Sequence, residues 1–75
     1  MRREVMLIEQ IRKELADNRA KHVQVLLKIV KGRKCIQFLS VDTDACRSKV
    51  KAICDRYCES LCFVSESSTT MLYSM

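Results

Sequence analysis

The 75-residue chain contains no proline, no tryptophan, one histidine and one glycine, Gly32. With so little glycine, a chain of this length has little material for a closed substrate pocket. It also lacks a glycine-rich phosphate loop and the GxSxG and HExxH motifs, and His22 has no visible partner constellation. The closest acids, Asp42 and Asp44, are interpreted with Thr43 as candidate N-caps of a helix and not as an acid/base pair. The sequence therefore predicts a protein that is not an enzyme and binds no cofactor.

Long apolar segments are also missing. No run approaches the roughly 20 apolar residues of a membrane-spanning helix. Glu4, Glu9 and Gln10 interrupt what would be the apolar centre of a signal peptide. We therefore expect a soluble, intracellular protein, cytoplasmic or nuclear, without membrane contact. In that setting the five cysteines are interpreted as reduced, mostly buried thiols, because an odd number leaves one unpaired in a disulfide framework.

Three of the cysteines, Cys54, Cys58 and Cys62, recur at intervals of four residues. On a helix, neighbours four residues apart can offer two thiolates to one zinc ion, but the third residue drifts round the cylinder. Cys35 or His22 would have to complete such a site from elsewhere in the chain. Buried structural thiols are the simpler interpretation, so no metal ligand is assigned, and a metal or redox role for the three cysteines stays open.

The composition that is present, 48% hydrophobic and 31% charged, is that of a globular protein, and its length predicts one small domain spanning 1–75. Apolar residues at helical spacing predict amphipathic helices over 3–19 and 43–61. A β-hairpin is predicted over 22–41, and 62–75 reads as one or two strands or as a polar tail. The expected fold class is α+β, a single αββαβ domain with the fourth strand left open. Its antiparallel sheet carries both helices on one face.

The hairpin is centred on the single glycine. Gly32 suits the first central position of a type II′ turn, which places Gly32 and Arg33 at the tip and Lys31 opposite Lys34. Because strand side chains alternate between faces, this register separates the hairpin into two apolar sets. The set expected in the core is Val23, Val25, Leu27, Ile29, Ile36 and Phe38 with Ser40, in which Ile29 faces Ile36, Leu27 faces Phe38 and Val25 faces Ser40.

The opposite face of the hairpin is also apolar and has no predicted cover from this chain. Monomeric proteins seldom expose contiguous apolar patches of this kind. The first functional hypothesis is therefore a non-enzymatic protein-interaction module, of the small inhibitor or adaptor type, that uses this face to form a homodimer or to bind a protein partner. The predicted interface residues are Leu26, Lys28, Val30, Cys35, Gln37, Leu39 and Val41.

Charge supports a second hypothesis. The formal net charge is +5, and the segment 19–51 alone holds nine basic against two acidic residues, a net +7. A concentration of cations on one segment is typical of surfaces that bind phosphates or acidic proteins. The alternative function is therefore nucleic-acid binding through phosphate contacts, and the same residues could equally meet an acidic protein surface. The predicted contact residues are Lys31, Arg33 and Lys34 at the hairpin tip, and Arg47 and Lys51 in the second helix.

Overall fold

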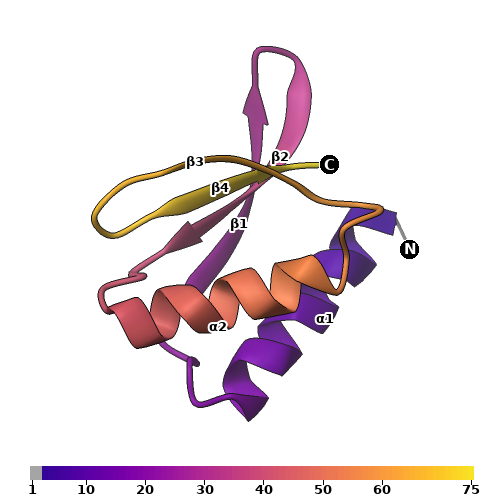
Figure 1. The fold of residues 1–75 in the computed structure, drawn as a ribbon. Helices are drawn as coiled ribbons and strands as arrows, with labels where there is room; N and C mark the ends of the chain where they lie inside the picture. Colours follow the sequence, from indigo (N-terminus) through magenta and orange to yellow (C-terminus); the bar gives the residue numbers. More distant parts are fainter. Residues whose placement is uncertain (1–2) are drawn as a thin grey trace.

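The computed structural model describes residues 3–75; residues 1–2 of the predicted domain lie outside the described part of the chain. Two helices and four strands follow one another along the chain (Figure 1). The predicted α+β class with an antiparallel sheet is confirmed, and the fourth strand that the sequence left open is present. The elements are α1 (Arg3–Asp17), β1 (Gln24–Val30), β2 (Arg33–Leu39), α2 (Asp44–Asp55), β3 (Cys62–Glu66) and β4 (Met71–Ser74).

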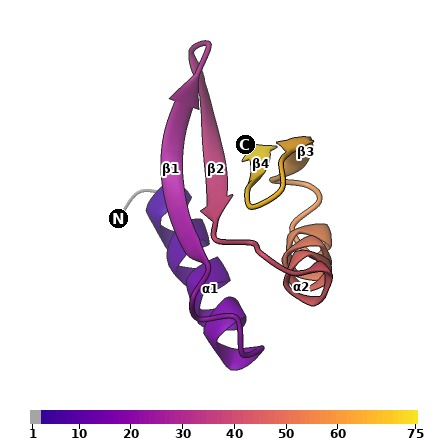
Figure 2. The same cartoon turned by 90° about the vertical axis from the view of Figure 1, so that its left-hand side faces the viewer.

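The sheet joins two αββ units of the same element order. Its strand order is β1-β2-β4-β3 and every neighbouring pair is antiparallel, so the second strand of each unit lies inside and β1 and β3 form the two edges. Figure 2 shows the upper part of the β1–β2 hairpin rising clear of the helices, with α1 beside the lower part of β1 and α2 below β3 and β4. Within residues 3–75, neither helix has the length and apolar character that crossing a bilayer requires.

The core lies between the two helices and one face of the sheet. The helices contribute buried side chains at helical spacing, among them Ile11 and Leu15 from α1 and Val50 and Ile53 from α2. The register places Val25, Phe38 and Met71 in one row across the sheet, and Ile36 pairs with Tyr73 in the next. All of these belong to a single buried cluster. Because this cluster joins both helices to the Val23/Val25 face of the sheet, the helices pack on the face that the sequence predicted.

Local backbone groups define where the helices begin and end. Thr43, one of three candidate N-caps, accepts the backbone N–H of Cys46 on its side-chain oxygen at 3.0 Å. At the end of α1, Arg19 takes a left-handed conformation (φ 61°), and the N–H of Ala20 reaches back to the carbonyl of Leu15. Helix α2 ends at Asp55, six residues before its predicted end.

The early end of α2 changes the geometry of the following residues. Residues 56–60 form turns in which the N–H groups of Ser60 and Leu61 both donate to the carbonyl of Tyr57. Leu61, the last residue of the predicted helix, is still buried because this turn returns it to the core. Cys58 and Cys62 therefore do not share a helix with Cys54.

The hairpin register differs from the predicted one by two residues. Lys31 and Gly32 are the central turn residues, with φ values of 51° and 79°, so the turn is of type I′. A type I′ turn matches the right-handed twist of the strands, and only Gly32 meets its left-handed requirement without strain. A shift of two residues preserves the faces and changes every partner. The observed pairs are Val30 with Arg33, Ile29 with Lys34, Leu27 with Ile36 and Val25 with Phe38.

Candidate functional site

The predicted outer interface is only partly exposed. Lys28 and Leu26 lie on the surface, while Val30, Gln37 and Leu39 are half-buried. Cys35 and Val41 are buried, so the expectation that they stand on an uncovered face is wrong. Cys35 has a short side chain between two paired strands, opposite Lys28 on β1 and Ser74 on β4.

Val41 is buried because the alternation of the strand ends one residue before it. Ser40 has a φ of 64°, outside the region that continues a strand. The chain turns there, the N–H of Val41 donates to the carbonyl of Thr69, and the Val41 side chain joins the core cluster. Val41 is therefore not part of the outer face. Of the apolar residues predicted there, mainly Leu26 is exposed.

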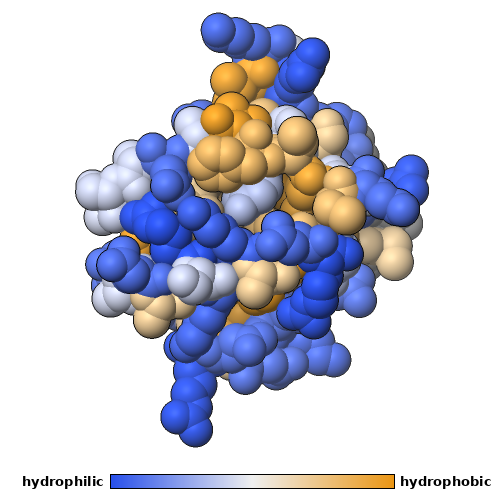
Figure 3. All heavy atoms as spheres, viewed as in Figure 1, coloured by the Kyte–Doolittle hydropathy of each residue, from blue (hydrophilic) through white to orange (hydrophobic). Residues whose placement is uncertain are grey.

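Two further exposed apolar residues of β1 lie on the face predicted to be core. Leu27 is 45% exposed and Ile29 60% exposed. The prediction that both lie in the core is wrong because the hairpin extends past the helices that would cover them (Figures 1 and 2). Figure 3 shows apolar surface in this upper part of the molecule, beneath the polar hairpin tip.

Strand β1 is also an edge strand, and its backbone pattern can be derived from its neighbours. The Lys34 carbonyl accepts the N–H of Met75, so the backbone groups of Lys34 point away from β1. Its partner Ile29 therefore points its own N–H and C=O away from β2, and so do Leu27 and Val25. The Val25 carbonyl agrees with this pattern, because it accepts a hydrogen bond from Arg12 Nη2 at 2.7 Å. Unpaired backbone groups and exposed apolar side chains thus coincide at Leu27 and Ile29.

The opposite edge, β3, is modified in a way that limits strand pairing. Phe63 and Val64 are about half exposed, but the pairing of β3 with β4 shifts register between Phe63 and Ser65. A bulge of this kind twists an edge and interrupts its row of hydrogen-bonding groups. Of the two edges, β1 is the one that can accept another strand without rearrangement.

The predicted phosphate-contact residues do not converge. Lys31 and Arg33 are exposed at the hairpin tip, and Lys34 pairs with Glu4 of α1. Arg47 is held by Glu66 at 3.1 Å and by two carbonyls of the β3–β4 turn at 3.0 Å, and Lys51 lies 3.8 Å from the same Glu66. The tip and the start of α2 lie at opposite ends of the molecule (Figure 1).

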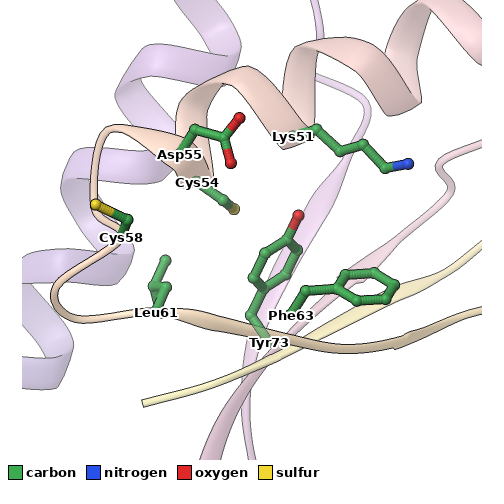
Figure 4. A pocket seen from close by; sticks show the side chains of 7 residues that line it. All are labelled: Lys51, Cys54, Asp55, Cys58, Leu61, Phe63 and Tyr73. Carbon is green, nitrogen blue, oxygen red and sulfur yellow. The ribbon is translucent and has the colours of Figure 1, made fainter.

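A pocket of about 240 Å³ lies between the C-terminal half of α2 and the strands β3 and β4 (Figure 4). The Tyr73 hydroxyl points toward α2, near the Cys54 side chain. Burial raises the pKa of Cys54 to about 12 and also raises the pKa of Tyr73. Both groups are therefore neutral at physiological pH, and neither is activated as a nucleophile. In Figure 4 the Cys58 sulfur points away from Cys54, so the two thiols do not form a metal-binding pair.

The five cysteines should differ sharply in reactivity. Cys58 and Cys62 are exposed, whereas Cys35, Cys46 and Cys54 are buried. We expect iodoacetamide at neutral pH to alkylate the two exposed thiols in the folded protein, and all five after denaturation, because only an accessible thiolate reacts. Peptide mass spectrometry after timed alkylation measures this. Alkylation of Cys54 as fast as Cys58 would contradict its burial.

A second cluster of chemically competent side chains lies at the base of the hairpin. His22 precedes β1, Asp42 follows β2, and Cys46 lies in the first turn of α2. His22 Nε2 is 3.6 Å from Cys46 Sγ and 3.4 Å from Asp42 Oδ1. Within residues 3–75, these three are the group of histidine, cysteine and acidic side chains whose ligand atoms converge, all within 4.8 Å of one another.

This cluster is not arranged as a nucleophile. In a Cys–His–Asp triad the carboxylate holds the ring nitrogen opposite to the one that faces the thiol. Here one nitrogen, Nε2, faces both partners. Burial first, and then the charge of Asp42, raise the pKa of the Cys46 thiol, which is the reverse of nucleophile activation.

Sequence reasoning missed this cluster because no spacing rule connects its members. The whole hairpin separates His22 from Asp42, and Asp42 and Cys46 were each explained by local roles, helix capping and core packing. The one local signal is an acid and a cysteine four residues apart at a helix start, which is too common to identify a site.

Comparisons with protein-family models, with curated proteins and with solved structures found no match to this chain.

Proposed function

We propose that this protein is a non-enzymatic interaction module that binds an extended, acidic segment of a partner protein along the free edge of β1. The observation that carries the proposal is the coincidence of unpaired backbone groups and exposed apolar side chains at Leu27 and Ile29. Addition of a strand to such an edge gives affinity through main-chain hydrogen bonds and specificity through alternate side chains. The binding surface is therefore the β1 edge of the hairpin and not its whole outer face.

The charges around this edge favour an acidic partner over a second copy of the chain. Lys28 lies within β1, and Lys31 and Arg33 stand at its upper end. The groove between α1 and the lower half of β1 is lined by Arg12, Lys13 and Lys21, among others. Two copies, each with a net charge of +5, would bring these cations together, whereas an acidic strand would neutralise them.

A synthetic peptide of alternating isoleucine and glutamate tests the proposal directly. We expect it to protect the amides of Leu27 and Ile29 from hydrogen exchange, because these groups lack a strand partner in the free protein. A peptide of alternating isoleucine and lysine should bind more weakly. The Ile29→Glu variant should weaken binding by about 10- to 100-fold, the equivalent of one lost apolar side-chain burial of roughly 1.5–3 kcal/mol.

The control is the Phe63→Glu variant on the bulged β3 edge, which should bind the peptide like the wild type. Leu27→Pro removes only an outward-facing N–H, which an edge strand tolerates, and should abolish protection with little loss of fold. Protection that moves to β3, or binding that survives Leu27→Pro, would contradict the proposal. A concentration-dependent dimer by light scattering, lost in Ile29→Glu, would assign the edge to a second copy of the chain.

Nucleic-acid binding stays a weaker alternative, and the exposed tip residues Lys31 and Arg33 support it. With two phosphate contacts, the logarithm of the binding constant should fall with the logarithm of the salt concentration with a slope of only about −2. This salt dependence is much weaker than that of proteins with six or more phosphate contacts. A steeper slope for RNA or DNA, reduced by Lys31→Ala/Arg33→Ala, would favour this alternative. Absence of salt-sensitive binding would remove it.

A further inference from the structure

We infer that His22, Asp42 and Cys46 form a binding site for a divalent transition metal ion, with Zn²⁺ as the natural occupant. The three residues come from three separate segments: the α1–β1 connection, the β2–α2 connection and the first turn of α2. Convergence of an imidazole nitrogen, a carboxylate oxygen and a thiol sulfur from different segments requires the folded chain. This inference does not depend on the proposed function of the β1 edge.

Two of the three separations between the ligand atoms match a tetrahedral zinc site, and the third, between Asp42 and Cys46, is at most 4.8 Å. With zinc–nitrogen and zinc–oxygen bonds of about 2.0–2.1 Å and a zinc–sulfur bond of about 2.3 Å, tetrahedral angles place nitrogen about 3.5 Å from sulfur and about 3.3 Å from oxygen. The observed separations from His22 Nε2 are 3.6 Å to Cys46 Sγ and 3.4 Å to Asp42 Oδ1. A metal ion can therefore enter with only small side-chain adjustments.

The chemistry of the donors also suits zinc. Imidazole, thiolate and carboxylate are its three usual protein ligands, whereas magnesium and calcium prefer oxygen donors alone. Cys46 as thiolate and Asp42 as carboxylate supply two negative charges to one dication.

The site is open on one side. The side chains of His22 and Asp42 are 51% and 60% exposed, while Cys46 is buried. The Cys46 thiol is the buried ligand, and the two other ligands are exposed. Three protein ligands leave the fourth tetrahedral position to water or to a donor atom from another molecule. The metal would join both strand bases of the hairpin to α2, so its binding would stabilise the base from which the β1 edge projects.

Cobalt substitution tests the site, because a thiolate ligand gives a charge-transfer band that other donors do not. We expect the purified full-length protein to bind one Co²⁺, with that band and with the strong visible absorption of four-coordinate cobalt, and Zn²⁺ to displace it. At free zinc of 100 times Kd, the melting temperature should rise by roughly 10–20 °C, since the metal binds the folded state.

The variants separate this site from other thiols. His22→Ala and Asp42→Asn change exposed side chains and should fold normally, yet each should weaken cobalt binding by at least about tenfold, and Cys46→Ser should remove the charge-transfer band. Cys58→Ser/Cys62→Ser removes the two exposed thiols and should bind like the wild type. A missing band in the wild type, a band lost only in Cys58→Ser/Cys62→Ser, or unchanged affinity in His22→Ala would each overturn the inference.

Discussion

The Phe38→Ala variant is expected to lose about 3–5 kcal/mol of unfolding free energy, the cost of removing a buried aromatic ring and leaving a cavity. Phe38 is fully buried at the centre of the sheet, between Val25 on β1 and Met71 on β4. A domain of 75 residues has a stability of roughly 4–11 kcal/mol, so this loss removes about a quarter of it or more. Urea denaturation followed by circular dichroism measures the difference.

Phe63→Ala provides a matched control. Phe38 and Phe63 both make edge-on contacts with Tyr73, at ring-centroid distances of 5.8 Å and 5.5 Å. Phe63, however, is 49% exposed, so its loss should cost only about 1 kcal/mol, the value of one aromatic contact with partial burial. Equal losses in the two variants would mean that ring contact, and not burial, determines the stability of this sheet.

Arg47→Ala should have the second-largest effect, about 2 kcal/mol of unfolding free energy. The guanidinium donates to Glu66 and to the carbonyls of Ser67 and Ser68, and its side chain is only 18% exposed. Hydrogen bonds to a charged, partly buried group are stronger than exposed ones. Without them the β3–β4 turn loses its hydrogen bonds to α2, and the strands that it joins should fray first.

Lys51→Ala is the control, because its ammonium lies 3.8 Å from the same Glu66 and its side chain is 50% exposed. Exposed pairs of this kind contribute roughly 0–1 kcal/mol. Arg47→Lys should not restore stability, because one ammonium cannot reproduce the planar fork that contacts Glu66 and both carbonyls. Hydrogen exchange of β4 amides measures the fraying; full rescue by lysine would show that charge alone suffices.

Several elements could be predicted because their signals are local. The α1 stripe of Ile8, Ile11 and Leu15 follows from helical periodicity, and all three are buried. The N-cap at Thr43 follows from the short-range chemistry of helix starts. The two faces of the hairpin follow from strand alternation, which a two-residue register error leaves unchanged.

The exposure of the hairpin residues could not be predicted, because the position of the helices in the folded molecule determines which hairpin side chains are covered. Leu27 and Ile29 have the apolar pattern of core residues, and only the length of the helices relative to the hairpin leaves them exposed. Val41 has the pattern of an outer-face residue, and one positive φ at Ser40 turns it into the core. The candidate edge therefore appears only when the position of α1 and α2 is known.

The β3–β4 turn and the cluster of His22, Asp42 and Cys46 show the same division. The sequence of the turn has no glycine or asparagine to specify it, and its geometry is held by Arg47 from a different element. His22, Asp42 and Cys46 lie far apart in the chain and meet only because the hairpin returns β2 to the base of β1. The sequence by itself determined the presence and order of the helices, the two faces of the hairpin and the fold class, since these depend on neighbours within a few residues. The tertiary structure alone decided which apolar residues face solvent and which polar side chains converge, because both depend on contacts between distant segments.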